Sequence, residues 1–324
     1  MDSLIKTLKE KRGLRENSLS IYKRLLNKLS NAITGNDYKS NAFLKSKQKE
    51  VMDFLKAQTS STKKNYISAI LVSLSPEERR KPSKNMKEVY NKYNSLLLEE
   101  HKKYYDSLKD KEKNNKESEN WLEWNDILKY RRKLGYEIKK LGYTQKSEKV
   151  KNRKDLELLQ KYLILSLYTL HPPRRLEYAD IKVIGNRDYE DLSEQERSDN
   201  IYLVKISRNK KFFSFGKNAV KSETNENVKI PVDKSLNSVI NLWLNFNKSD
   251  HFLLNSRGGK LTKNGLTKFI QKIFKPLGKN ISASMLRKIK VSHELDPEYE
   301  QKKADLAEKM NHSTKVQKDV YLKK

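Results

Sequence analysis

Near the C-terminal end of the sequence, a histidine and a tyrosine stand at a spacing that suits nucleophilic chemistry. His312 is followed by Ser313, and Tyr321 comes nine positions after the histidine. A phenol has an ordinary pKa of about 10, so at neutral pH it attacks poorly without assistance. If Tyr321 attacks a phosphate ester, it needs cations on the non-bridging oxygens, a proton acceptor and an acid for the leaving oxygen. The rest of the chain should therefore supply arginines and a lysine.

The charge of the chain points to a polyanion as its partner. Lysine and arginine total 70 against 41 aspartate and glutamate residues, which gives a formal charge of +29 over 324 residues. This excess is larger than solubility requires, and it favours nucleic acid as the partner. A genome biased toward lysine and asparagine codons is the alternative source of the charge.

The composition also argues against several classes of protein. The chain contains no cysteine, and its five histidines are scattered without metal-ligand spacing. Disulfides and thiolate metal sites are therefore excluded. No apolar run reaches transmembrane length, and the first residues lack the apolar core of a signal peptide. We expect an intracellular protein that acts where DNA is found, with no cofactor, no metal and no membrane partner.

The C-terminal motif resembles that of the tyrosine recombinases, the site-specific recombinases of phage-integrase type. Their last motif is Leu/Met-Gly-His-Ser, followed by the nucleophilic tyrosine at this spacing. The run Met310-Asn311-His312-Ser313, with Tyr321, matches it, and Asn311 stands in the place of the glycine. The resemblance implies that an arginine, a lysine on a turn between strands and a second arginine precede the histidine in that order.

The first arginine is expected at the end of an apolar helix over 155–170, where two arginines follow two prolines. Arg174 with Glu177 matches the Gly-Leu-Arg-x-x-Glu of integrases. Arg175 with Glu177 matches a Pro-Pro-x-Arg-x-Asp/Glu pattern of relatives from large DNA viruses and their mobile parasites. We favour Arg175, and Glu177 is then the carboxylate that holds the region.

The lysine is expected between two candidate strands, 211–215 and 227–232. Lys221, in Val-Lys-Ser, resembles the aromatic-Lys-Thr of the viral relatives, whereas Lys217, in Gly-Lys, resembles the bacterial form. We favour Lys221. The alternative, in a chain this rich in lysine, is that either residue is an ordinary surface lysine.

The second arginine of the resemblance belongs to a His-x-x-Arg motif on a helix. Arg287 fits this place, because Leu-Arg-Lys-Ile opens an amphipathic helix 25 residues before His312. Ser284 replaces the usual histidine. A hydroxyl can donate a hydrogen bond to a phosphate oxygen, but it carries no charge, so the role of position 284 stays open.

The resemblance implies a role for each of these residues. Tyr321 would attack the scissile phosphate and form a 3′-phosphotyrosyl bond, while Arg175 and Arg287 hold the non-bridging oxygens. Lys221 would protonate the leaving 5′-hydroxyl, and His312 would orient the phosphate or help to deprotonate the tyrosine. Because the covalent intermediate keeps the bond energy, no ATP is needed. The implied partner is double-stranded DNA, bound by a homo-tetramer that assembles on it.

The elements that must position these residues fall into two predicted domains. Residues 1–85 predict a helical bundle, because apolar residues recur there at helical spacing, and the resemblance makes it a SAM-like core-binding domain that clamps DNA. Residues 86–118 predict a charged, exposed helix and linker. Residues 119–324 correspond to the catalytic domain.

The second domain is predicted to be mainly α with a small antiparallel β-sheet, an α+β fold. The segment 155–170 is apolar nearly all round, which is typical of a buried helix, and Pro172-Pro173 ends it. Short β-branched or aromatic runs predict strands at 201–207, 211–215 and 227–232. The remainder is predicted to be helical.

Two other functions stay open. A type IB topoisomerase uses the same chemistry without strand exchange, but the helical N-terminal part argues against it, because topoisomerases of similar length begin with a mostly β part. A catalytically weakened DNA-binding relative is favoured by Ser284 and by Asn311. The target DNA, and the choice between integration, excision and resolution, do not follow from the sequence.

Overall fold

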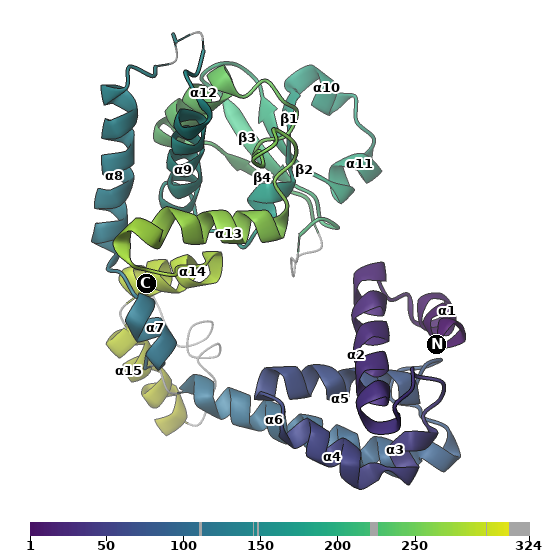
Figure 1. The fold of residues 1–324 in the computed structure, drawn as a ribbon. Coiled ribbons are helices and arrows are strands. Elements are labelled where there is room, and N and C mark those ends of the chain that lie inside the picture. Colours follow the sequence, from purple (N-terminus) through teal and green to yellow (C-terminus); the bar gives the residue numbers. More distant parts are fainter. Residues whose placement is uncertain (110–111, 145, 148, 221–225, 296, 311–324) are drawn as a thin grey trace. The chain divides into compact units, whose positions relative to one another are not determined.

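The chain separates into two compact units, Met1–Glu112 and Lys113–Lys324. The computed structural model describes residues 1–109, 112–144, 146–147, 149–220, 226–295 and 297–310 (Figure 1). Each unit encloses a hydrophobic core of its own.

The described part of the first unit contains helices and no strand. Its elements are α1 (Asp2–Arg12), α2 (Glu16–Thr34), α3 (Ala42–Ser46), α4 (Gln48–Lys56), α5 (Ser60–Leu74), the 3-10 turn η1 (Lys84–Met86) and α6 (Lys87–Lys109). Local sequence sets the helix ends. Thr59 caps α5 by accepting a hydrogen bond from the Thr62 N–H, and Gly13 ends α1 in the left-handed conformation.

Helix α6 differs from the exposed helix that the sequence predicts over 86–118. Tyr90 and Tyr93 of α6 are buried in the core of the first unit, where the helix packs against α5. Glu100 is also buried and forms an ion pair with Lys63, with Nζ and Oε1 separated by 2.8 Å. The apolar stripe of α6 is narrow and flanked by many charges, so composition alone hides it.

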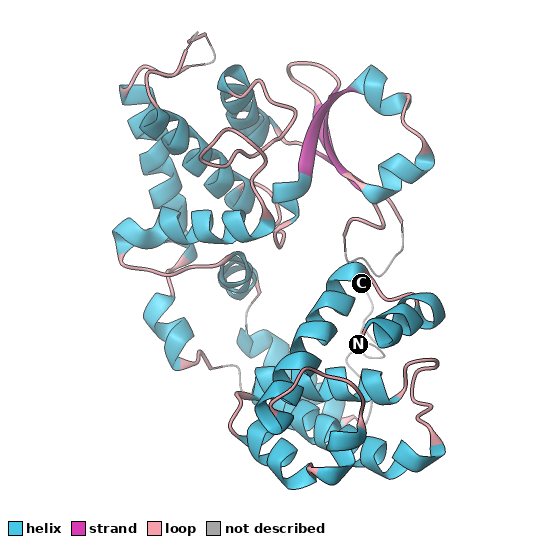
Figure 2. Cartoon of the chain, turned by 45° about the vertical axis from the view of Figure 1, so that its right-hand side comes forward, coloured by secondary structure: helices cyan, strands magenta, loops and turns pink. Residues whose placement is uncertain are grey.

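The second unit is mainly helical and carries the sheet (Figure 2). Its elements are α7 (Asn115–Asn120), α8 (Trp124–Lys140), α9 (Arg153–Thr169), η2 (Glu177–Asp180), β1 (Ile181–Gly185), α10 (Asn186–Glu190), α11 (Glu194–Asp199), β2 (Ile201–Lys205), β3 (Lys211–Phe215), β4 (Val228–Pro231), α12 (Lys234–Phe246), α13 (Lys263–Phe274), η3 (Lys275–Leu277), α14 (Ala283–Glu294) and α15 (Pro297–Lys309). The predicted fold class, mainly α with a small sheet, is confirmed.

The sheet itself is mixed, so the prediction that it is antiparallel is wrong in one respect. Its strand order is β1-β2-β3-β4, with β1 parallel to β2 and the other pairs antiparallel. The three predicted strands are present as β2, β3 and β4. The missed strand, β1, precedes a crossover through α10 and α11, which is the kind of connection that parallel pairing requires.

Helix α9 lies at the centre of the second unit, as its apolar sequence predicts. Leu163, Leu167 and Tyr168 are fully buried, and the helix packs against α8, α12 and α13. Each buried leucine contributes roughly 1.5–3 kcal/mol relative to exposure. The helix ends at Thr169, three residues before the first of the two prolines. It thereby fixes the position of the arginines that follow.

We expect residues 1–112 to fold as a separate fragment, because the first unit has its own core. Circular dichroism should show a helical fragment with one cooperative thermal transition. A shorter fragment, 1–86, provides the control, since it lacks α6 and therefore the buried Tyr90 and Tyr93. It should lose the cooperative transition, and a non-cooperative 1–112 fragment would contradict the division.

Candidate active site

The arginine segment is attached to the buried helix α9 through a tyrosine. Tyr168, in the last turn of α9, donates its hydroxyl hydrogen bond to the backbone carbonyl of Arg175 at 2.5 Å. Tyr168 is fully buried, and burial raises its pKa well above the usual range, so the hydroxyl keeps its proton. The backbone at Arg175 is therefore held by the core of the unit.

An aromatic cluster lies beneath this segment. The Tyr178 hydroxyl lies 3.0 Å from Nδ1 of the buried His171, and the Tyr178 ring packs edge-on against Tyr168, with 5.3 Å between centroids. Burial lowers the pKa of His171, so the imidazole is neutral at pH 7. Nε2 of His171 and Oε2 of Glu177 are buried and have no hydrogen-bond partner among the described residues. Buried polar atoms without a partner are uncommon in native proteins. This segment therefore has hydrogen-bonding groups that its described neighbours do not satisfy.

The two neighbouring arginines have different surroundings. The Arg174 guanidinium lies over the ring of Phe215, 3.7 Å from its centroid, and is half-buried. Burial lowers the pKa of Arg174, and the nearby Tyr178 and Glu177 oppose this shift. The Arg175 side chain is exposed. Arg174 therefore packs against the end of β3, whereas Arg175 is available to a partner in solvent.

Arg287 comes from a distant part of the sequence and lies within electrostatic range of the same buried tyrosine. Ser282 caps α14 by accepting a hydrogen bond from the Met285 N–H at 3.2 Å, and Arg287 is half-buried one turn further on. After burial, the charges of Tyr178 and Glu177 raise the pKa of Tyr168, and that of Arg287 lowers it. Tyr168 therefore holds the Arg175 carbonyl by a hydrogen bond and lies within electrostatic range of Arg287.

Ser284, the residue that replaces the histidine of the motif, is exposed in the first turn of α14. The predicted helix around Arg287 is thus confirmed, with Ser284 one turn before the arginine. At this place a hydroxyl can reach an oxygen acceptor in solvent but cannot add a charge.

The connection that carries the candidate lysines begins directly after β3. The Lys217 N–H donates to Oδ1 of Asn227 at 2.8 Å, so the two ends of the connection are tied together. The Lys217 side chain is partly buried. Lys221 lies outside the described residues, as do its neighbours up to position 225.

The base of this connection is fixed to the end of α11. The Gly216 N–H donates to the Asn200 carbonyl at 3.0 Å, and the Asn218 N–H donates to the Ser198 carbonyl at 2.9 Å. A Cβ atom on Gly216 would lie 2.2 Å from the Ser198 carbonyl oxygen. Only glycine therefore allows this close approach of two backbone segments.

His312, Ser313 and Tyr321 lie outside the described residues. Of the predicted site residues, the structure describes Arg174, Arg175, Ser284 and Arg287, and the catalytic roles of all of them, like the lysine, the histidine and the tyrosine nucleophile, stay predictions.

Within the described ranges, no group of three or more His, Cys, Asp or Glu side chains is arranged to hold a metal ion. Asp180, which follows Glu177 in the same 3-10 turn, forms ion pairs with Lys260 and Lys263 at 2.9 and 2.8 Å.

None of the described helices has both the length and the apolar character needed to cross a membrane.

The buried supports of the site are not apparent from the sequence. Tyr168, Tyr178 and His171 hold the arginine segment, and Gly216 and Asn227 hold the lysine connection. The available signal was weak, because aromatic residues next to an apolar helix are typical of any core. The glycine directly after a strand was the clearest sign of a close backbone approach.

Comparison with known proteins gives little further information. No family model matches the chain, and no curated protein is significantly similar to it. The crystal structure of XerA recombinase is similar at 11% sequence identity, covering 88% of this chain and 81% of that chain, with a TM-score of 0.30. A likeness this loose carries no argument about function.

We expect Gly216→Ala to destabilise the second unit by about 1–3 kcal/mol, because the added methyl group would clash with the Ser198 carbonyl. All three tryptophans of the chain lie in this unit, so urea unfolding followed by tryptophan fluorescence measures its stability. Gly259→Ala is the matched control, since its Cβ would meet only the Asn255 side chain, at 3.3 Å. Equal stability of the two variants would contradict this account.

Proposed function

We propose that this protein breaks and rejoins DNA strands through a 3′-phosphotyrosyl intermediate, as a site-specific recombinase of the tyrosine recombinase type. The observation that carries the proposal is that Arg287, from a distant part of the sequence, lies within electrostatic range of Tyr168, whose hydroxyl holds the Arg175 carbonyl. Two arginines that reach one phosphodiester suit it well, because the guanidinium fork pairs with two phosphate oxygens. The order of the sequence motifs provides the remaining support.

In this proposal Arg175 and Arg287 bind the non-bridging oxygens of the scissile phosphate. Tyr321 attacks phosphorus, the bond to the 5′-oxygen breaks, and that oxygen takes a proton from Lys221. His312 accepts the phenol proton or orients the phosphate. Attack by a 5′-hydroxyl on the phosphotyrosyl bond then rejoins a strand and releases the tyrosine.

The two neighbouring arginines are proposed to have different roles, because their surroundings differ. Arg174 is stacked on Phe215 and half-buried, so it positions the segment and adds positive potential. Arg175 is exposed, with its backbone held by Tyr168, so its side chain is available to the phosphate.

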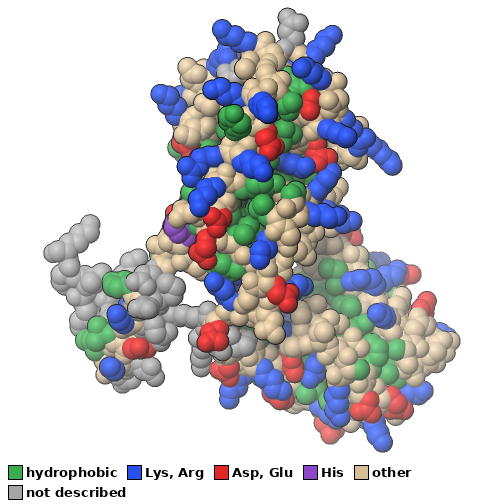
Figure 3. Space-filling model, turned by 60° about the vertical axis from the view of Figure 1, so that its left-hand side comes forward, with side chains coloured by type: hydrophobic (Ala, Val, Ile, Leu, Met, Phe, Trp, Pro, Cys, Tyr) green, Lys and Arg blue, Asp and Glu red, His purple; other side chains and the backbone are tan. Residues whose placement is uncertain are grey.

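Binding to DNA is supported by the charge of the chain. The formal charge is +29, and Figure 3 shows lysine and arginine side chains spread widely over the visible face. Each phosphate that these side chains neutralise releases counterions, which supplies affinity without sequence preference. Four copies on two duplexes would provide the paired cleavages that strand exchange requires.

A type IB topoisomerase is the second candidate, because it would use the same residues. The helical make-up of the described residues of Met1–Glu112 favours the recombinase over that candidate. Relaxation of supercoiled DNA by a single copy, without joining of two duplexes, would favour the topoisomerase instead.

We expect the protein to form a covalent adduct with a suicide DNA substrate, and Tyr321→Phe to lose that adduct while it still binds DNA. The reason is that phenylalanine lacks the nucleophilic oxygen. Tyr299→Phe is the control, because Tyr299 is an exposed tyrosine of α15, and it should form adduct at the wild-type rate. Adduct formation by Tyr321→Phe at that rate would exclude Tyr321 as the nucleophile.

Arg175→Ala and Arg287→Ala should each reduce the rate of cleavage by about 10²–10³-fold, because each removes a contact to transition-state charge. Arg174→Ala should mainly lower stability in urea unfolding, through loss of the stacking on Phe215. Arg257→Ala, at an exposed turn, should change neither quantity. If Arg174→Ala loses cleavage at unchanged stability while Arg175→Ala keeps it, the roles of the two arginines are exchanged.

A further inference from the structure

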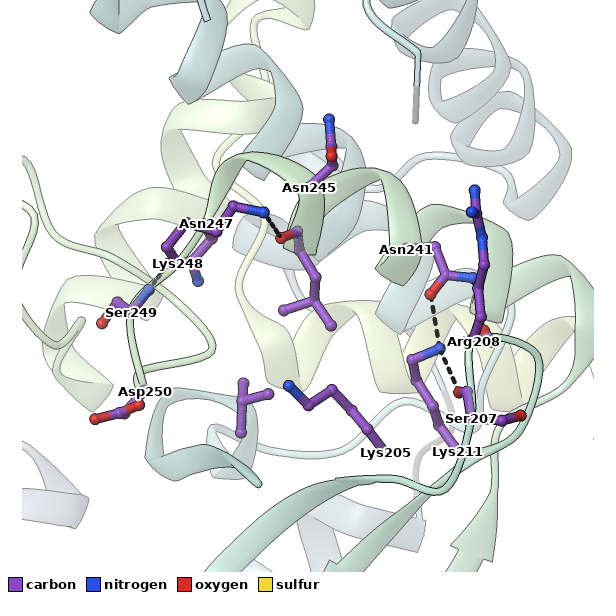
Figure 4. A pocket seen from close by; sticks show the side chains of 12 residues that line it. Lys205, Ser207, Arg208, Lys211, Asn241, Asn245, Asn247, Lys248, Ser249 and Asp250 are labelled. Atoms are coloured by element: carbon purple, nitrogen blue, oxygen red, sulfur yellow. Dashed lines mark hydrogen bonds between the residues drawn. The ribbon is translucent and has the colours of Figure 1, made fainter. Parts of the chain in front are cut away.

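A positively charged pocket of about 500 Å³ lies in the second unit, at the end of the sheet where β2 turns into β3 (Figure 4). The turn and strand ends form one wall, and α12 with the residues that follow it forms the other. Four cationic side chains line the pocket, Lys205, Arg208, Lys211 and Lys248, against the single carboxylate of Asp250. Most of the other lining groups are amides and hydroxyls.

One wall of this pocket is fixed by a buried lysine. Lys211 is only 3% exposed. Its Nζ donates to the Arg208 carbonyl at 2.7 Å, to Oδ1 of Asn237 at 2.8 Å and to Oδ1 of Asn241 at 2.7 Å. The same carbonyl accepts from the side-chain amides of both asparagines. The turn is therefore held on α12, and Lys211 acts as a scaffold with all three of its protons in use.

The three lysines of the pocket lack a carboxylate partner among the described residues. Lys205 lies directly opposite Lys211 in the β2–β3 register, an arrangement of like charges that destabilises a sheet. Burial first, and then the charges of Lys205 and Arg208, lower the pKa of Lys211 to about 8. In the part of the chain that the structure describes, neither Lys205, Lys211 nor Lys248 takes part in an ion pair. An anion is the group that would complete this arrangement.

We propose that this pocket binds a phosphate group, either of a nucleic acid backbone or of a free phosphate compound. The lysines supply charge, and two hydroxyls are suited to donate. Ser207 and Ser249 accept hydrogen bonds from the N–H groups of Lys210 and His251 at 3.1 and 3.0 Å, so their own protons can point to a ligand. The volume lies in the range of about 300–1,000 Å³ that small ligands occupy.

The pocket is separate from the candidate active site. Lys211 begins β3 and Phe215, which carries the stacked Arg174, ends it. At about 3.4 Å per residue, the strand separates the two ends by about 14 Å. A phosphate in the pocket is therefore not the scissile one, and the proposal does not depend on the proposed function.

The test compares two double variants that remove the same charge. Lys205→Gln with Lys248→Gln removes the two exposed lysines of the pocket and leaves the Lys211 scaffold in place. Lys139→Gln with Lys140→Gln is the matched control at the exposed end of α8. Calorimetric titration with inorganic pyrophosphate should show at least tenfold weaker binding for the pocket variant and wild-type binding for the control.

Binding of a DNA duplex at several salt concentrations distinguishes the two sources of phosphate. If the backbone of nucleic acid occupies the pocket, the pocket variant also binds duplex more weakly than the control and with a smaller salt dependence, and pyrophosphate competes with duplex. If a free phosphate compound occupies it, only pyrophosphate binding changes. Equal binding of both probes by the two variants, each folded by tryptophan fluorescence, would overturn the proposal. The single variant Lys248→Gln replaces the double variant if the latter fails to fold, and it is judged by the same outcomes.

Discussion

The candidate active site depends on one buried hydrogen bond, from the Tyr168 hydroxyl to the Arg175 carbonyl. A buried hydroxyl without a partner costs about 1–3 kcal/mol, so this bond ties the arginine segment to the most buried helix of the unit. Burial raises the pKa of Tyr168 well above its usual range, which keeps the hydroxyl protonated and able to donate at neutral pH. The charge of Arg287 opposes this rise in the pKa of Tyr168, so the second arginine lies within electrostatic range of the same hydroxyl.

Strand β3 has two separate tasks. At its end, Phe215 supports Arg174, and Gly216 begins the connection that carries the candidate lysines. At its start, the buried Lys211 holds the turn that forms one wall of the charged pocket. A paired strand suits both tasks, since its backbone hydrogen bonds on either side allow little movement of its ends. The end of α11 adds to this, because the Asn200 carbonyl that follows it accepts a hydrogen bond from the Gly216 N–H.

Local patterns in the sequence predicted much of this fold, and nonlocal contacts account for most of the errors. Helix α9 and strands β2 to β4 are continuous runs of apolar or β-branched residues bounded by turns, so their sequences suffice. Strand β1, although its run Ile-Lys-Val-Ile is β-branched, was missed, and its pairing with β2 is parallel and joins segments that a crossover separates. The burial of α6 depends on its packing against α5, and the many charges of α6 hide this burial in the sequence. In the site, motif spacing indicated Arg175 and Arg287, whereas the supporting roles of Tyr168 and His171 arise only from tertiary contacts.

Position 284 carries no positive charge, and the surroundings of the arginine segment offer a source of positive potential in its place. Where the motif of the tyrosine recombinases has a histidine, Ser284 contributes a hydroxyl alone. The segment, however, contains Arg174 stacked on Phe215, which belongs to an aromatic cluster with Phe213 and Tyr178, and the exposed Arg175 stands next to it in the chain. A floor of low polarity strengthens the attraction between a guanidinium and a phosphate, because fewer waters screen it. If the site acts as proposed, Arg174 can therefore supply, from beside Arg175, the positive potential that Ser284 does not.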